Sequence, residues 1–82
     1  MDDADRTRTT TLHLTGMPAV HAVRAVEFAL GAVPGVVAVE VTRQYAVVTH
    51  DAQMPTERLT DAVQLAGATV TGWRIERRLP VV

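Results

Sequence analysis

Residues 11–30 read TLHLTGMPAVHAVRAVEFAL, and the change of pattern inside this stretch decides the fold. Leu12 and Leu14 alternate with polar neighbours, which is the period of a half-buried strand. Gly16 and Pro18 then interrupt the alternation, and apolar residues recur at spacings of three and four, as in an amphipathic helix. The stretch therefore predicts a strand that passes through a short loop into a helix.

The remainder of the chain extends this pattern in both directions. Valine-rich runs with turn residues between them predict two further strands, and a second amphipathic run begins near Pro55 and predicts a second helix. The resulting order is βαββαβ, which is the ferredoxin-like α+β fold: a four-stranded antiparallel sheet with two helices on one face. We expect strands at residues 10–15, 36–42, 45–50 and 69–76, and helices that end at Gly31 and Gly67.

Length and composition set the domain organisation. Eighty-two residues, 48% of them hydrophobic, allow one domain with a real core. We expect a flexible lead-in at residues 1–9, the domain at residues 10–76 and a tail at residues 77–82, in which Pro80 cannot donate to a strand ladder.

Several classes of function find little support in the composition. A net charge of −1 provides no electrostatic basis for binding nucleic acid or an anionic membrane. The chain contains no Cys, Ser or Asn, so most nucleophiles are missing and we expect no enzyme. The acidic start is unlike a signal peptide, and no apolar run reaches the roughly 20 residues of a membrane span. We therefore expect a cytoplasmic protein without membrane insertion.

Residues 16–23, Gly-Met-Pro-Ala-Val-His-Ala-Val, lie at the predicted junction of the first strand and first helix. They resemble the signature loop of the heavy-metal-associated domain family, which is copper-chaperone-like and carries the pattern Gly-Met-x-Cys-x-x-Cys. The later landmarks at residues 26–30, 34–36, 46–51 and 59–67 resemble that family in the same order and spacing. The resemblance covers residues 10–70.

The resemblance implies that two cysteines of this loop hold Cu(I) or Zn(II) in the family, because thiolates are soft ligands. In this sequence Ala19 and Ala22 occupy those positions, and alanine has no donor atom. A third departure is Ala68, where family members often carry an aromatic side chain. We therefore expect no cofactor as the chain stands, and Cu(I) or Zn(II) only in a parent with cysteines at positions 19 and 22. The two alanines are compatible with natural divergence and with deliberate replacement.

Met17 and the three histidines are weaker candidates for metal binding. Met17 and His21 flank the alanines and are a possible but weak copper pair. His13 is expected on the strand face opposite the core, away from that pair. The His50-Asp51 dipeptide ends a predicted strand, and we expect it to be a solvated strand terminus rather than a catalytic dyad.

Two functions are favoured by the sequence alone, and a homodimerising, small-ligand regulatory domain of the same fold is a third, weaker option. The first is a heavy-metal trafficking module, similar to a metallochaperone or to the N-terminal domain of a metal-transporting ATPase, in a cysteine-less form that binds metal weakly or not at all. The second is a metal-free protein-interaction domain on the same scaffold. A partner such as a metal-transporting ATPase is possible in either case, and the oligomeric state is open. Candidate docking residues are Trp73, Arg74, Arg77 and Arg78.

Overall fold

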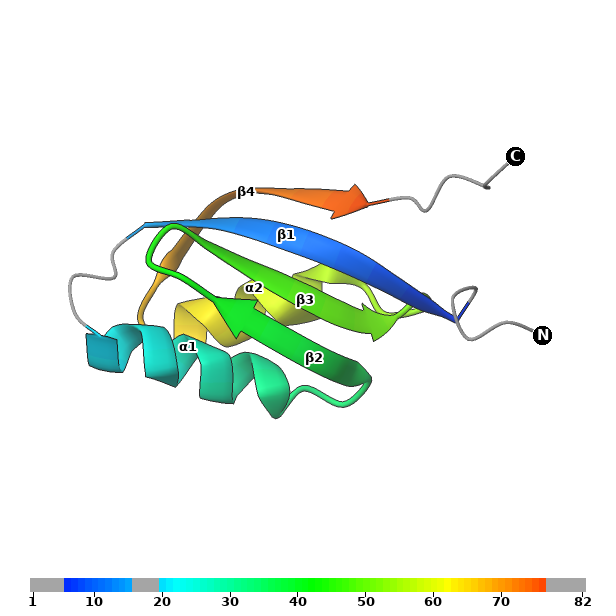
Figure 1. Cartoon of the computed structure of the whole chain (residues 1–82), viewed down its shortest axis with the longest axis horizontal. Coiled ribbons are helices and arrows are strands. Elements are labelled where there is room, and N and C mark those ends of the chain that lie inside the picture. The colour runs from blue at the N-terminus through cyan, green and yellow to red at the C-terminus, as the bar shows by residue number, and fades with distance from the viewer. Residues whose placement is uncertain (1–5, 16–19, 77–82) are drawn as a thin grey trace.

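The computed structural model describes residues 6–15 and 20–76, which contain four strands and two helices (Figure 1). The strands form one sheet in the order β2-β3-β1-β4, and every neighbouring pair is antiparallel. The predicted ferredoxin-like βαββαβ fold is therefore confirmed. The elements are β1 (Thr7–Thr15), α1 (Val20–Gly31), β2 (Val36–Val41), β3 (Tyr45–Asp51), α2 (Thr56–Leu65) and β4 (Thr69–Glu76).

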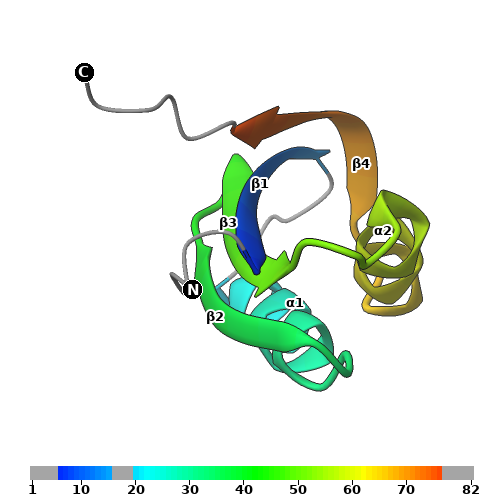
Figure 2. The ribbon, with the colours of Figure 1, turned by 90° about the vertical axis from the view of Figure 1, so that its right-hand side faces the viewer.

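Both helices lie on the same face of the sheet, side by side (Figures 1 and 2). On the two central strands the residues that face the helices are buried: Thr10, Leu12, Leu14, Ala46, Val48 and His50. The residues between them on the other face are exposed or half-buried, as strand alternation requires. Within residues 6–15 and 20–76, neither helix is long and apolar enough to cross a membrane. The buried hydrophobic core consists of Leu12, Leu14, Val26, Leu30, Ala46, Val48, Leu59, Ala62, Val63 and Ala68.

The first strand is longer than the sequence predicts. It begins at Thr7 instead of Thr10, and Thr7 pairs with Asp51 while Thr9 pairs with Thr49. Residues 7–9, which were expected to belong to a flexible lead-in, are therefore part of the sheet. The physical reason is that β-branched threonine suits a strand, and β3 extends far enough to supply partners for these residues.

The ends of α2 are determined by backbone chemistry. Pro55, expected in the first turn, stands one residue before it in an extended conformation. At the other end Gly67 adopts a φ of 95°, which glycine tolerates because it has no Cβ. Its N–H donates to the carbonyl of Gln64 (3.0 Å), and the N–H of Ala68 donates to the carbonyl of Val63 (3.2 Å). This pair of bonds closes the helix and turns the chain into β4.

Candidate functional site

The predicted site lies where β1 ends and α1 begins, and three segments meet at that end of the sheet (Figure 1). Thr15, the last residue of β1, pairs with Thr69, the first residue of β4. The N–H of Leu14 donates to the carbonyl of Gln44 in the turn between β2 and β3, at 2.7 Å. The fold thus brings the start of β4 beside the strand that leads into the loop.

Ala22 and Ala68 are the two described positions of the predicted site. Ala68 is 5% exposed and belongs to the core, and the partly buried Ala22, in the first turns of α1, packs against that same core. Both side chains end in a methyl group, which offers no lone pair to a cation. These positions therefore contribute packing and not ligation.

The side chains of five other predicted residues lie outside the described part of the structure. Met17 and Ala19 belong to residues 16–19, and only the backbone of His21 is described, as part of α1. Arg77 and Arg78 follow the last described residue. The roles assigned to these five residues stay predictions.

The two described histidine side chains lie on opposite faces of the sheet, at different points along β1. His13 is exposed on the open face of the sheet, where it pairs with Tyr45, as predicted. His50 pairs with Arg8, seven residues along β1 from Thr15, which is about 23 Å at the usual strand rise. Among the described side chains, no group of three or more His, Asp or Glu residues is placed to hold a metal ion.

The prediction for His50 is wrong in one respect, because this residue is not a solvated strand terminus. It is 2% exposed, and its Nε2 lies 2.6 Å from the hydroxyl of the fully buried Thr10. Its Nδ1 lies 2.8 Å from the backbone carbonyl of Asp51, which can only accept, so Nδ1 carries a proton. In the neutral ring Nε2 then accepts from Thr10. The signal was present in the sequence, since His50 is in phase with the buried Ala46 and Val48.

Trp73 and Arg74, predicted as one docking cluster, point to opposite faces of β4. Trp73 pairs with the buried Leu12 and so lies on the helix side, whereas Arg74 pairs with Thr11 on the open face. Both side chains are exposed. A partner that contacts both must therefore approach the edge of the strand.

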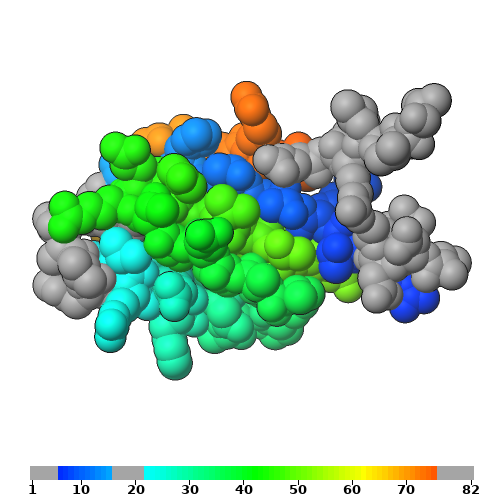
Figure 3. Space-filling model, viewed as in Figure 1, coloured from blue at the N-terminus to red at the C-terminus, as the bar shows by residue number. Residues whose placement is uncertain are grey.

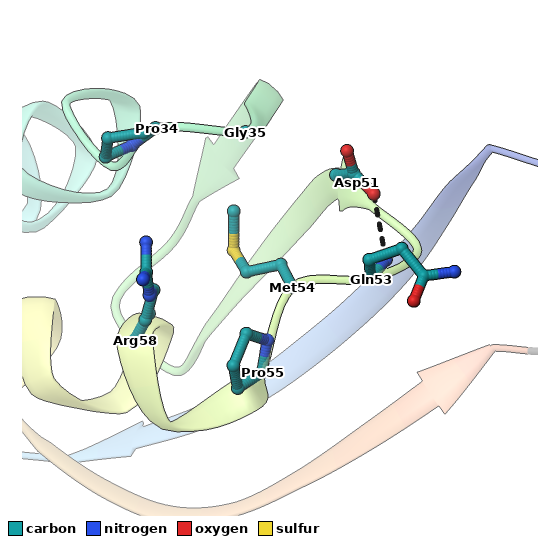
Figure 4. A pocket seen from close by; sticks show the side chains of 7 residues that line it. All are labelled: Pro34, Gly35, Asp51, Gln53, Met54, Pro55 and Arg58. Atoms are coloured by element: carbon teal, nitrogen blue, oxygen red, sulfur yellow. Dashed lines mark hydrogen bonds between the residues drawn. The ribbon is translucent and has the colours of Figure 1, made fainter.

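A shallow, open pocket of about 240 Å³ lies between the turn before β2 and the start of α2 (Figure 4). Gly35 has a φ of 95°, which side-chain-bearing residues rarely adopt, and a Cβ there would lie 2.7 Å from the terminal methyl of Met54, a flexible end that would have to move aside. Asp51 accepts the N–H of Gln53 at 2.8 Å, which holds the adjoining turn. The lining residues are Pro34, Gly35, Asp51, Gln53, Met54, Pro55 and Arg58. None of them belongs to the predicted loop.

Comparison with solved structures finds similarity over most of the chain. Oxidized MerP from Ralstonia metallidurans CH34 is 37% identical, with 80% of this chain and 99% of that chain covered and a TM-score of 0.71. The N-terminal domain of PacS from Synechocystis PCC6803 is 32% identical, with 84% and 97% covered and a TM-score of 0.68. The CopZ metallochaperone is 27% identical, with 77% and 98% covered and a TM-score of 0.72. No family model and no curated protein matches the chain.

Proposed function

This chain belongs to the heavy-metal-associated domain family, and from that membership we propose that it is a heavy-metal trafficking module in a cysteine-less form. The scaffold supports the proposal, since the βαββαβ order, the strand-to-loop-to-helix junction and the identity to solved relatives all agree. One of those relatives is described as a metallochaperone. We place the protein in the cytoplasm and assign it no enzymatic activity, as its sequence predicts.

The observation that carries the proposal is the replacement of both thiolate positions by Ala19 and Ala22. Two thiolates supply charge and soft donor atoms to Cu(I), and two methyl groups supply neither. The remaining donor side chains in the sequence from residue 16 to residue 23 are Met17 and His21, and neither is an anion. We expect Cu(I) and Zn(II) to bind weakly or not at all.

A titration of the purified protein with Cu(I), in competition with a colorimetric Cu(I) chelator, tests this proposal. The expected result is that the chelator keeps the copper at every protein concentration up to about tenfold excess. A His21→Ala variant is the matched control for any residual uptake, because it removes one of the two remaining donors. Binding at 1:1 stoichiometry with a sub-micromolar Kd would contradict the proposal.

We propose as a second candidate a metal-free docking domain, which uses the scaffold for contact with a partner and not for ion transfer. Exposed apolar side chains favour it, because Trp73 is 56% exposed and tryptophan is enriched at interfaces. A metal-transporting ATPase domain from the same organism is the first partner to test, by pull-down with and without Cu(I). Binding that is indifferent to metal supports docking, and absence of binding under both conditions counts against it.

A further inference from the structure

The two edges of the sheet differ in how they are protected. β2 is a short edge strand with α1 packed beside it, and its pairing with β3 is irregular between Val36 and Ala38. Figure 3 shows α1 and β2 as one continuous surface. Such bulges and coverings are the usual means of preventing another strand from pairing with an edge.

The opposite edge, β4, lacks this protection. It is eight residues long, contains neither Pro nor Lys, and within the described sheet no strand pairs with its outer side. α2 approaches only the beginning of β4, and the second half of the strand rises away from the helix (Figures 1 and 2). The outer backbone groups of that half are therefore available for pairing with another chain.

The side chains along this half of β4 alternate between apolar and cationic. Trp73 and Ile75 pair with the buried Leu12 and Thr10 and so face the helix side, where they remain 56% and 42% exposed. Arg74, which lies between these two residues in the sequence, faces the opposite, open face of the sheet. A strand that pairs with β4 therefore meets apolar side chains on one face and a guanidinium on the other.

β1 and β4 together carry a formal charge of +1, from Arg8, Arg74 and Glu76, although the whole chain carries −1. Residues 7–15 and 69–75 contain two arginines and no carboxylate, and Glu76 is the only acidic residue of β1 or β4. In the sequence Arg77 and Arg78 follow β4, whereas Asp2, Asp3 and Asp5 precede β1. The other acidic residues of the described chain lie on the helices, on β2 and at the end of β3: Glu27, Glu40, Asp51, Glu57 and Asp61.

From these observations we propose that the outer edge of β4 binds an extended segment of a partner protein in which apolar and acidic side chains alternate. Backbone hydrogen bonds to β4 supply affinity, and the alternation supplies specificity. Apolar residues of the segment pack on Trp73 and Ile75, and acidic residues face Arg74. This proposal rests on the docking role proposed above and specifies its site and partner chemistry.

The test uses a blocked ten-residue peptide that alternates valine and glutamate, with a valine–lysine peptide of the same length as the control. Trp73 is the only tryptophan in the chain, so its fluorescence reports binding directly. We expect a blue shift of the emission and at least tenfold tighter binding of the glutamate peptide than of the lysine peptide. Amide shifts in ¹H–¹⁵N spectra should concentrate on β4.

Two edge variants locate the site. Ile75→Lys should weaken binding of the glutamate peptide at least tenfold, whereas Val37→Lys, at a 69% exposed position on the other edge strand, should leave it unchanged. Arg74→Glu changes an exposed side chain and should reverse the preference, so that the lysine peptide binds more tightly than the glutamate peptide. This variant also tests the site if Ile75→Lys does not fold. Equal affinity for both peptides, loss of binding in Val37→Lys alone, or no emission shift at millimolar peptide would overturn the proposal.

Two further results separate this proposal from the function proposed above. A dimer of the chain joined through β4, detected by sedimentation equilibrium, would overturn it by making a second copy the occupant. An ATPase domain that binds with amide shifts on α1 and none on β4 would also overturn it, yet would leave the docking function intact. The Cu(I) titration is independent of both results.

Discussion

The hydroxyl of Thr10 lies 2.6 Å from Nε2 of His50, and both side chains are buried beneath the helices. The other ring nitrogen bonds to the carbonyl of Asp51, so the ring has a partner at each nitrogen. Among the described residues, no buried side-chain nitrogen or oxygen lacks a hydrogen-bond partner. This polar pair links β1 and β3 inside an otherwise apolar core.

Replacing Thr10 by valine keeps the shape of the side chain and removes the hydrogen-bond partner of His50. The buried nitrogen is then unsatisfied, and we expect the free energy of unfolding to fall by about 1–3 kcal/mol. Urea denaturation measures the change. Thr11→Val, the neighbour on the other face, is the matched control and should stay within about 0.5 kcal/mol of the parent. Equal stability of the two variants would argue against the Thr10–His50 bond.

Three glycine-to-alanine variants separate backbone strain from steric contact. Gly31 has an ordinary φ and open space around a Cβ, Gly67 has a φ of 95° and open space, and Gly35 combines a φ of 95° with the 2.7 Å approach to Met54. We expect Gly31→Ala to raise the free energy of unfolding by up to about 1 kcal/mol, because Gly31 is the last helical residue of α1 and alanine favours the helix more than glycine does. Gly67→Ala should destabilise by about 1–2 kcal/mol, and Gly35→Ala by at least as much, because both force a side chain into a φ of 95° and the second also displaces the Met54 methyl. A thermal midpoint of either variant at or above that of Gly31→Ala would contradict these two turn geometries.

Ala68 occupies a core position where family members often carry an aromatic side chain. Because it is buried and its N–H is fixed by the carbonyl of Val63, Ala68→Phe should overpack the core and cost about 1–3 kcal/mol. Leu65→Phe, at a largely exposed position near the same end of α2, should change stability by less than about 0.5 kcal/mol. Chemical denaturation of both variants provides the comparison, and a neutral Ala68→Phe would show that this end of the core has room for a ring.

The element order was predictable because every strand and helix carries its own period and ends at a turn residue. The fourth strand was predicted at residues 69–76 and is found there, and the third was predicted at residues 45–50 and is found at Tyr45–Asp51. Short apolar runs bounded by Gly and Pro are the clearest local signals in a single sequence.

The missed features depend on pairing between distant segments. Thr7 joins β1 because β3 offers partners for it, and local composition does not reveal that. The ladder between β1 and β4 shifts register between His13 and Leu14, so Thr71 is an extra residue on β4. Trp73 and Arg74 were grouped by proximity in sequence, although strand alternation separates them.

Of the candidate site, the structure describes only the end of the strand, the start of the helix and Ala68, so the roles predicted for the loop residues stay predictions. The spacing of Ala19 and Ala22 after the strand identified the loop, and the structure places Ala22 near the start of α1 as expected. The burial of Ala68 depends on the closing turn of α2 and was not readable from composition. The position of the loop follows from local pattern, whereas its surroundings follow from the tertiary fold.

The most direct measurement of the central claim is a Cu(I) competition titration of the parent beside an Ala19→Cys/Ala22→Cys variant. If donor atoms alone decide binding, the variant takes up one Cu(I) with a Kd at least a thousandfold lower than the parent, which leaves the ion with the chelator. Equal, tight uptake by both proteins would contradict the account, since the alanines would then not be the reason for weak binding. So would a well-folded variant that binds no better than the parent.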